Sequence, residues 1–462
     1  MNNIFVGSAE ILRQKEIALS LCERTRGKTA CVITFGCQQN EADSEIIAGT
    51  LETCGYTVIE DDSAADVVVI NTCAIREHAE VRALSEAGQF KGIKERDRSR
   101  LIGVCGCMAQ LPHRREQIKK SYPYVDFVFG TDMHHRIPEI IKAALDSKKR
   151  VTFANDLPHS EFGVISEGLP VRRSGSLKAW VPVMYGCNNF CSYCVVPYVR
   201  GRERSRDRKS VEEEVYSLLQ AGYKDITLLG QNVNSYSGGC DFATLLRSVC
   251  SFGGEYRIRF MTSHPKDASD DLIKAIAECG NAAKQFHLPV QSGNDRILGL
   301  MNRKYTRAQY LEKAHKIKSI IPDVAITSDI ICSFPTETAA EFDDTVSLVE
   351  EVGFDMLYTF IYSPRVGTRA AEMEGRIPKE ESSRRFALLS DRENAIAQSI
   401  NEKSVGKTVR VLSEGIGKNG LPAGRTSGNK IVVFDKPVPE GQFVDIVIEK
   451  AQAYSLTGKL KD

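Results

Sequence analysis

Ala179 to Cys194 reads Ala-Trp-Val-Pro-Val-Met-Tyr-Gly-Cys-Asn-Asn-Phe-Cys-Ser-Tyr-Cys. The first half of this stretch is a short and almost continuous apolar run, which is typical of a strand buried on both faces of a parallel sheet. The second half begins where that strand should end and places three cysteines within eight residues. The stretch therefore predicts a buried strand that leads directly into a cysteine-rich loop.

Five similar apolar runs follow, and charged stretches of helical character separate them. They are Asp225–Leu229, Tyr256–Met261, Gln285–Val290, Ala325–Ile331 and Met356–Ile361. Strands that alternate with helices and end in polar residues are typical of barrels of TIM type. Since six units leave such a barrel open on one side, we expect a partial (βα)6 barrel over residues 176–398.

Upstream of this barrel, the chain alternates strands and helices in the same way. Four short runs rich in β-branched residues are Ala30–Phe35, Asp66–Ile70, Leu101–Val104 and Val125–Phe129. Their spacing suits βαβ units. We therefore expect a doubly wound parallel α/β domain over residues 1–147. Turn-forming residues such as Asn155-Asp156-Leu157-Pro158 predict a linker over residues 148–175.

The last part of the chain, residues 399–462, has a different pattern. Its short strand-like runs are Val409–Glu414, Lys430–Phe434, Phe443–Glu449 and Tyr454–Lys459, with Gly, Asn and Pro turns such as Asn419-Gly420 between them. Regularly spaced short strands with turn signals predict a small antiparallel β-barrel.

Composition excludes several classes of protein. The 462 residues carry a net charge of +1, and 42% of them are hydrophobic, as in ordinary globular chains. No apolar run reaches the roughly 18 residues of a membrane span, and residues 1–15 do not resemble a secretory signal. We therefore expect a cytoplasmic protein without a membrane partner. In a reducing cytosol the fourteen cysteines point to metal binding or catalysis rather than to disulfides.

Cys187, Cys191 and Cys194 are the strongest metal-binding candidates. Thiolates favour iron–sulfur clusters or zinc, but structural zinc normally takes four ligands, and the next cysteine is Cys240. Three thiolates around a [4Fe-4S] cluster would leave one iron open to a non-protein ligand. The alternatives are a zinc site closed from afar and a trio of inert core cysteines.

Cys37, Cys73 and Cys107 follow three of the predicted N-terminal strands. In an open parallel sheet, ligands bind beyond the carboxyl ends of the strands. These three cysteines should meet there and bind a second [4Fe-4S] cluster, although each alone would pass for a buried structural cysteine. Cys105 is the alternative to Cys107 as the third ligand. We favour Cys107 because it lies where the chain passes from the strand into a loop.

Several segments carry a resemblance to known proteins. They are Phe35-Gly-Cys-Gln-Gln-Asn-Glu, Asn71-Thr-Cys-Ala-Ile-Arg-Glu, Gly106-Cys-Met-Ala-Gln, Arg200-Gly-Arg-Glu-Arg-Ser-Arg, Gly230-Gln-Asn-Val-Asn-Ser-Tyr, Thr262-Ser-His-Pro-Lys, His287-Leu-Pro-Val-Gln-Ser-Gly and Arg303-Lys-Tyr-Thr-Arg. With the CxxxCxxC loop, they resemble the methylthiotransferases of the radical S-adenosylmethionine superfamily. Gly424-Arg-Thr and Asn429-Lys are similar to the TRAM domain, a small RNA-binding β-barrel. The resemblance extends from about residue 28 to 462.

This resemblance implies two [4Fe-4S] clusters, with S-adenosylmethionine as methyl donor and radical source. Gln38-Gln39 and Ala74-Ile75-Arg76 favour the type that methylthiolates C2 of N6-(dimethylallyl)adenosine beside the anticodon, at position 37 of tRNA. Methylthiotransferases acting on ribosomal protein S12 or on threonylcarbamoyladenosine tRNA are the alternatives. The expected partners are the modified tRNA, an electron donor such as flavodoxin or ferredoxin, and a sulfur source. We expect a monomer.

The resemblance also suggests contacts for the ligands. Polar groups near the barrel mouth are candidates for binding S-adenosylmethionine: Tyr193, Gln231, Ser263 and Gln291. Each could instead be hydrated or cap a loop. The arginines expected to contact RNA phosphates are Arg200, Arg202, Arg204 and Arg206, although local ion pairs would explain them too. Ser333-Phe-Pro-Thr-Glu-Thr departs from the family's Gly-Phe-Pro-Gly-Glu-Thr, because serine and threonine replace both glycines.

Overall fold

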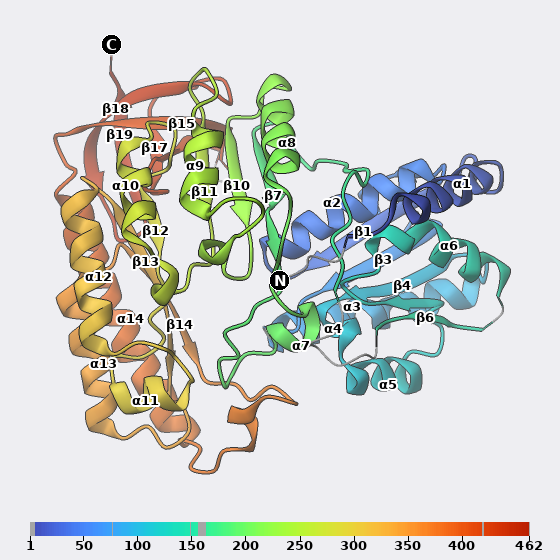
Figure 1. Cartoon of the computed structure of the whole chain (residues 1–462), viewed down its shortest axis with the longest axis horizontal. Coiled ribbons are helices and arrows are strands. Elements are labelled where there is room, and N and C mark those ends of the chain that lie inside the picture. Colours follow the sequence, from blue (N-terminus) through green and yellow to red (C-terminus); the bar gives the residue numbers. More distant parts are fainter. Residues whose placement is uncertain (1–4, 76, 148, 156–162, 418–419, 462) are drawn as a thin grey trace.

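The computed structural model describes residues 5–75, 77–147, 149–155, 163–417 and 420–461. Arg76, Asp156-Leu157-Pro158 and Asn419 of the sequence analysis lie outside these ranges. Figure 1 shows an N-terminal sheet (blue to cyan) beside a central barrel (green to orange), while a C-terminal barrel (red) packs on one end of the central one.

The N-terminal domain is a six-stranded sheet in which all neighbouring strands are parallel. Its order is β2-β1-β3-β4-β5-β6, formed by β1 (Thr29–Phe35), β2 (Thr57–Val58), β3 (Val67–Thr72), β4 (Leu101–Gly106), β5 (Phe127–Phe129) and β6 (Val151–Phe153). Its helices are α1 (Ser8–Thr25), α2 (Gln38–Thr53), α3 (Glu77–Arg96), α4 (Cys107–Gln110), α5 (Pro112–Ser121), the 3₁₀ turn η1 (His134–Arg136) and α6 (Ile137–Asp146).

The apolar residues of these strands alternate between two cores. Val67 and Val69 pack with residues of α1, α2 and α6, whereas Val68 and Ile70 pack with residues of α3 and α5. A period of two places successive side chains on opposite faces of a sheet, so helices cover both faces and the predicted doubly wound domain is confirmed. Strands β2 and β6 were not predicted, and β6 lies inside the predicted linker.

The central strands form the expected partial barrel. They are β7 (Lys178–Pro182), β10 (Asp225–Leu229), β11 (Arg257–Phe260), β12 (Gln285–His287), β13 (Ala325–Cys332) and β14 (Met356–Ile361). Parallel pairing gives two three-stranded sheets, β7-β10-β11 and β12-β13-β14, which meet at the bridge between Ile258 and Ala282. Within the described ranges no pairing joins β7 to β14, so the barrel stays open there.

Helices cover the outside of this barrel and share one large core with its strands. They are α8 (Arg208–Gln220), α9 (Phe242–Cys250), α10 (Asp270–Glu278), α11 (Asp295–Leu300), α12 (Arg307–Ile320), α13 (Ala339–Val352) and α14 (Lys379–Glu402). Shorter elements are β8 (Met184–Tyr185), α7 (Val196–Arg200), β9 (Arg204–Ser205), η2 (Val233–Ser235), η3 (Pro265–Asp267) and η4 (Arg369–Glu372). Among the helices that the structure describes, none has the length and apolar character needed to cross a membrane.

The C-terminal part is a closed five-stranded barrel. It consists of β15 (Thr408–Ile416), β16 (Pro422–Thr426), β17 (Ile431–Phe434), β18 (Phe443–Ala451) and β19 (Ser455–Leu460), in the order β15-β16-β17-β19-β18. The prediction of an all-antiparallel barrel is wrong at one place, because β17 and β19 are parallel. Strand β16 was not predicted, and α14 continues to Glu402, past the boundary expected at residue 398.

The C-terminal barrel covers the end of the central barrel at which its strands begin. Arg259, on β11, donates to the carbonyl oxygens of Thr426 (3.2 Å) and Ser427 (3.1 Å). Lys178, where β7 begins, and Lys430 form ion pairs across the same contact, with Glu414 and Asp355 respectively. Because these contacts lie at the amino ends of the strands, the carboxyl ends remain available for the functional site.

Candidate active site

The loop with Cys187, Cys191 and Cys194 lies between β8 and α7, at the carboxyl end of the barrel. Gly186 begins it with a φ of 75°, and a Cβ there would lie 2.1 Å from the Arg202 carbonyl oxygen. Only glycine fits such a place. The Gly186 N–H donates to Oε1 of Gln231, so the start of the loop is held in place.

One side chain of this loop and one from a distant segment reach its sulfur atoms. Nδ2 of Asn189 lies 3.5 Å from Sγ of Cys187, and Nη1 of Arg303 lies 3.5 Å from Sγ of Cys191. Burial raises the pKa of the Cys187 thiol to about 12 and that of Cys194 above its usual range. Such thiols ionise when a metal centre binds them, so the donor set fits a cluster.

Cys37, Cys73 and Cys107 lie together at the carboxyl edge of the N-terminal sheet. Cys37 caps α2 after β1, Cys73 follows β3, and Cys107 begins α4 after β4. These three strands are neighbours in the sheet, and the chain leaves β1 and β3 in opposite directions, which is where open α/β sheets bind ligands.

The thiols of this second set influence one another. A hydrogen bond between the side chains of Cys37 and Cys73 lowers the pKa of Cys37 to about 6, and the same contact, with burial, raises the pKa of Cys73. The backbone N–H of Ile75 donates to Sγ of Cys73 at 3.2 Å. Cys105 instead packs in the apolar core of the domain, so its side chain faces away from Cys107.

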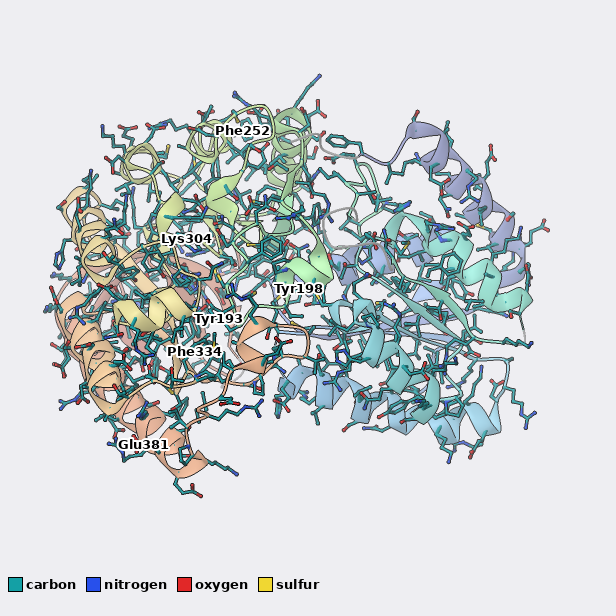
Figure 2. The ribbon with its side chains drawn as sticks, turned by 60° about the horizontal axis from the view of Figure 1, so that its bottom comes forward. Tyr193, Tyr198, Phe252, Lys304, Phe334 and Glu381 are labelled. Atoms are coloured by element: carbon teal, nitrogen blue, oxygen red, sulfur yellow. The ribbon has the colours of Figure 1, made fainter. Side chains whose placement is uncertain are left out.

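The two cysteine sets face one interface between the domains. Cys107 and Leu111 pack against Val195 and Val199, which directly follow Cys194. Oγ1 of Thr131 donates to the Val199 carbonyl oxygen at 2.6 Å. Figure 2 shows Tyr193 and Tyr198 near the middle of the molecule, where the barrel meets the N-terminal sheet.

No three His, Cys, Asp or Glu side chains in the described ranges lie close enough to share one metal ion. In a cluster each thiolate binds a different iron, so its ligands are spread more widely. By donor chemistry, three thiols on either side of the interface suit iron–sulfur clusters.

The residues predicted to bind S-adenosylmethionine surround the carboxyl end of the barrel. Gln231 accepts from Gly186 and also donates to Gln39 at 3.4 Å. Gln291 has a φ of 74°, and Tyr193 packs in an apolar cluster with Phe334. The buried Oγ of Ser263 has no hydrogen-bond partner in the described part of the chain.

Buried Oγ atoms of Ser192 and Ser333 are likewise without a partner among the described residues. Buried polar groups are nearly always hydrogen-bonded, so orphaned ones point to a missing polar ligand. The amino and carboxylate groups of S-adenosylmethionine have the right chemistry for these three hydroxyls.

The loop that departs from the family keeps the backbone shape of its missing glycines. Ser333 and Thr336 have φ values of 61° and 67°. Oε2 of Glu337 accepts from the Ser333 N–H at 2.8 Å and from Arg385 at 2.9 Å. This buried ion pair links the loop to α14, and no pattern in the sequence indicates that Glu337 and Arg385 pair.

The arginines predicted to contact RNA differ in their surroundings. Arg200 and Arg206 are buried in ion pairs with Asp43, Glu167 and Glu214. Arg204 is buried and donates to three backbone carbonyls. This corrects the expectation for these three, because their guanidinium groups are not available to phosphates in this structure. Arg202 is exposed and lies over the ring of Phe190, 4.4 Å from its centre.

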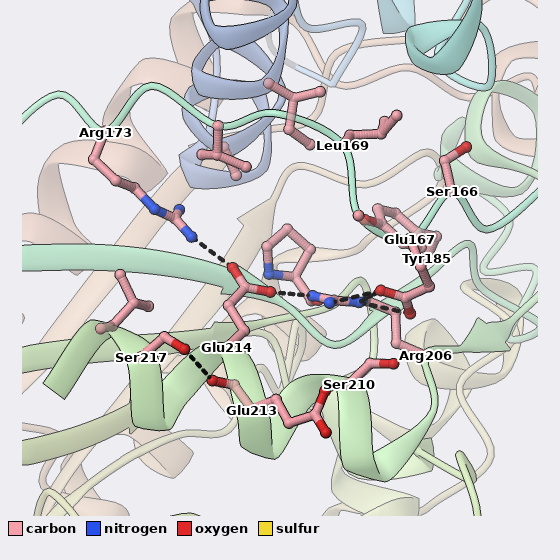
Figure 3. A pocket seen from close by; sticks show the side chains of 16 residues that line it. Ser166, Glu167, Leu169, Arg173, Tyr185, Arg206, Ser210, Glu213, Glu214 and Ser217 are labelled. Carbon is pink, nitrogen blue, oxygen red and sulfur yellow. Dashed lines mark hydrogen bonds and ion pairs between the residues drawn. The ribbon is translucent and has the colours of Figure 1, made fainter. Parts of the chain in front are cut away.

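A pocket of about 480 Å³ lies between the linker, α2 and α8, and none of the six cysteines lines it. Figure 3 shows its charged groups joined in a chain: Arg173 to Glu214 (2.5 Å), Glu214 to Arg206 (2.7 Å) and Arg206 to Glu167 (2.8 Å). The charged groups of this pocket therefore satisfy one another.

Comparisons with known proteins agree with this architecture. Residues 29–130 match the uncharacterized protein family UPF0004, residues 181–349 the radical SAM superfamily and residues 402–461 the TRAM domain. A curated tRNA-2-methylthio-N(6)-dimethylallyladenosine synthase of Acetivibrio thermocellus is 46% identical, with 99% of this chain and 98% of that protein covered. One from Clostridium perfringens is 47% identical, with 94% and 98% covered.

Solved structures share the fold at low identity. The radical S-adenosylmethionine methyltransferase TsrM from Kitasatospora setae gives a TM-score of 0.54 at 13% identity, covering 74% of this chain and 77% of TsrM. The cobalamin-dependent S-adenosylmethionine radical enzyme OxsB gives 0.51 at 12% identity, with 80% and 57% covered.

Proposed function

Because this chain belongs to the family of tRNA-2-methylthio-N(6)-dimethylallyladenosine synthases, we propose that it transfers a methylthio group to C2 of N6-(dimethylallyl)adenosine at position 37 of tRNA. The observation that carries the proposal is the pair of three-cysteine sets that face one interface. Radical chemistry suits this target, since an aromatic C2–H has no useful acidity and the cofactor carries the hard step.

Each set of cysteines would hold one [4Fe-4S] cluster. Cys187, Cys191 and Cys194 would bind the cluster that supplies the electron for cleaving S-adenosylmethionine, and Cys37, Cys73 and Cys107 the one that supplies sulfur. The protein orients these groups: Gly186 and Gln231 fix the first loop, and Arg303 donates to its central sulfur. Ser192, Ser263 and Ser333 would bind the amino-acid part of S-adenosylmethionine through their orphaned hydroxyls.

The tRNA would be held at two separate places. The C-terminal barrel lies at the amino ends of the strands and the cysteines at the carboxyl ends. The eight residues of β13 span about 26 Å at ~3.3 Å per residue. The C-terminal barrel would therefore bind the stem, while the target base enters between the cluster sites, flipped out of its loop. Exposed Arg202 is the candidate for a phosphate contact near the base.

The remaining partners belong to the same proposal. A low-potential electron donor such as flavodoxin or ferredoxin would reduce the radical cluster, and a sulfur source would replenish the second one. We propose that the chain acts as a monomer.

Iron content and activity together test the proposal. Anaerobically reconstituted protein should hold about eight iron, and the variant with Cys187, Cys191 and Cys194 changed to Ala about four, at four per cluster. The wild type should add a methylthio group to tRNA carrying N6-(dimethylallyl)adenosine, as read by nucleoside mass spectrometry. Modification of ribosomal S12 or of threonylcarbamoyladenosine tRNA instead would overturn the substrate assignment. Four iron in the wild type and none in the variant would exclude the second cluster.

A further inference from the structure

We propose that Arg200 is a positioning residue of the second cluster, where its buried guanidinium balances the negative charge of the sulfur ligands and fixes this site against the loop of Cys194. The inference rests on the proposed function, because the charge to be balanced is that of a cluster bound by Cys37, Cys73 and Cys107.

The guanidinium of Arg200 crosses the domain interface. Arg200 is the last residue of α7, six residues after Cys194, and its side chain is 5% exposed. Nη2 donates to Oδ2 of Asp43 at 2.7 Å. Asp43 is 1% exposed and lies on α2, the helix that Cys37 caps.

The same guanidinium lies beside the second set of cysteines. Val199, the residue before Arg200, packs with Cys107. Helix α2, which carries Asp43, begins directly after Cys37. A guanidinium carries five N–H donors in a planar fork, so a bond to one carboxylate oxygen leaves donors for sulfur. The backbone of Arg200 thus lies on the helix that follows the first loop, while its side chain reaches the second site.

A buried ion pair needs a reason, because removing two charges from water costs about as much as their attraction returns. The pair of Arg200 and Asp43 alone is neutral and could be replaced by apolar residues. A cluster with three thiolate ligands is anionic, and a nearby cation and hydrogen bonds to its sulfurs raise its reduction potential. The reason for burying Arg200 here is therefore electrostatic as well as structural.

The two members of the pair should act in opposite directions. Arg200→Gln removes the cation and leaves Asp43 buried, so the midpoint potential of the second cluster should move to more negative values. Asp43→Asn removes the anion and leaves Arg200 uncompensated, so the potential should become more positive. Arg200→Lys keeps the charge and should lie between the wild type and Arg200→Gln.

Arg206→Gln is the matched control. Arg206 lies in the same segment, is also buried, and pairs with Glu167 on the linker and Glu214 on α8. Its loss should cost stability but leave the potential of the second cluster unchanged.

The experiment is a redox titration followed by electron paramagnetic resonance, on full-length reconstituted protein. Cys187, Cys191 and Cys194 are changed to Ala in every sample, so that only the second cluster is read. Thermal unfolding of each metal-free sample reports folding. If the variant that carries only these three Cys→Ala changes holds no iron, the proposed function itself is wrong, and this inference falls with it.

Opposite shifts for Arg200→Gln and Asp43→Asn, with none for Arg206→Gln, support the inference. Loss of iron in Arg200→Gln that Arg200→Lys restores, with iron retained in Arg206→Gln, supports it too. Unchanged potentials, shifts in the same direction, or equal loss of iron in Arg200→Gln and Arg206→Gln would overturn it.

Discussion

Arg303 and Cys191 are 112 residues apart in sequence, yet Nη1 of the arginine lies 3.5 Å from Sγ of the cysteine. The same guanidinium donates to the Pro289 carbonyl oxygen at 2.7 Å and to the Tyr305 hydroxyl at 2.8 Å. The barrel thus holds one donor against the middle sulfur of the first loop.

Arg303→Met should weaken this site. A hydrogen bond to a charged group contributes about 1.5–3 kcal/mol, or roughly 10- to 100-fold. We expect a loss of that size in the rate of S-adenosylmethionine cleavage, measured as 5′-deoxyadenosine formed per bound iron. Arg307→Met, which removes an arginine paired with Glu351 on the outer helices, is the control. Equal rates for both variants would contradict the prediction.

Ser333→Gly should stabilise the metal-free protein. Ser333 has a φ of 61°, a conformation that costs a non-glycine residue roughly 1–2 kcal/mol, and its buried hydroxyl has no partner in the described part of the chain. Glycine relieves this strain, although it also raises the entropy of the unfolded chain, which offsets part of the gain. We therefore expect a net increase of about 1 kcal/mol in the free energy of unfolding, measured by denaturant titration. Ser390→Gly, within α14, should lower stability instead. A loss of stability in Ser333→Gly would count against strain at this turn.

His264 should make the free energy of unfolding decrease as the pH falls. Burial lowers the pKa of this imidazole to about 2, from an ordinary value near 6.5, so the folded state keeps it neutral while the unfolded state binds a proton. The stabilising effect is complete above about pH 6.5. As the pH falls below about 6.5, the free energy of unfolding decreases by up to about 1.4 kcal/mol per pH unit.

His264→Asn should remove this part of the pH dependence. Free energies of unfolding measured between pH 6.5 and 5.5 should fall less steeply in the variant than in the wild type. His315→Asn, at an exposed position on α12, should keep the wild-type slope. Parallel slopes for wild type and His264→Asn would show that His264 does not contribute.

Arg259→Met should weaken the contact between the two barrels and lower the stability of the protein. Arg259 binds buried Asp225 at 2.9 Å and two carbonyl oxygens of the C-terminal barrel. Its loss leaves a buried carboxylate unpaired, which costs about 3–5 kcal/mol. Arg410→Met breaks an exposed pair with Glu255 and should cost less than about 1 kcal/mol. Thermal unfolding distinguishes them, and similar losses would contradict the assigned role.

Arg202→Gln should weaken tRNA binding and reduce its salt dependence. One phosphate contact fewer lowers the slope of log affinity against log salt by about one. Filter binding at several salt concentrations measures this slope. Arg384→Gln, at an exposed arginine on the outer helix α14 paired with Glu381, is the control. An unchanged slope in Arg202→Gln would exclude the phosphate contact.

Local patterns in the sequence were sufficient for most of the fold. Short, almost continuous apolar runs predicted all six strands of the central barrel, and β10 and β14 have the predicted bounds. Strands β2 and β6 are short edge strands that are not fully buried, so they lack the continuous apolar run that marks the buried strands. The parallel pairing of β17 with β19 has no local signature, because strand direction in a barrel depends on its closure.

The grouping of the cysteines and the order of the domains were determined by the sequence itself, since cysteine spacing and strand-end positions are local properties. The surroundings of the arginines were decided by tertiary structure alone. Arg200 and Arg202 look equivalent in sequence, but one is buried against Asp43, 157 residues away, and the other is exposed. Charge is a property of the residue, whereas burial and partners exist only once distant segments have packed together.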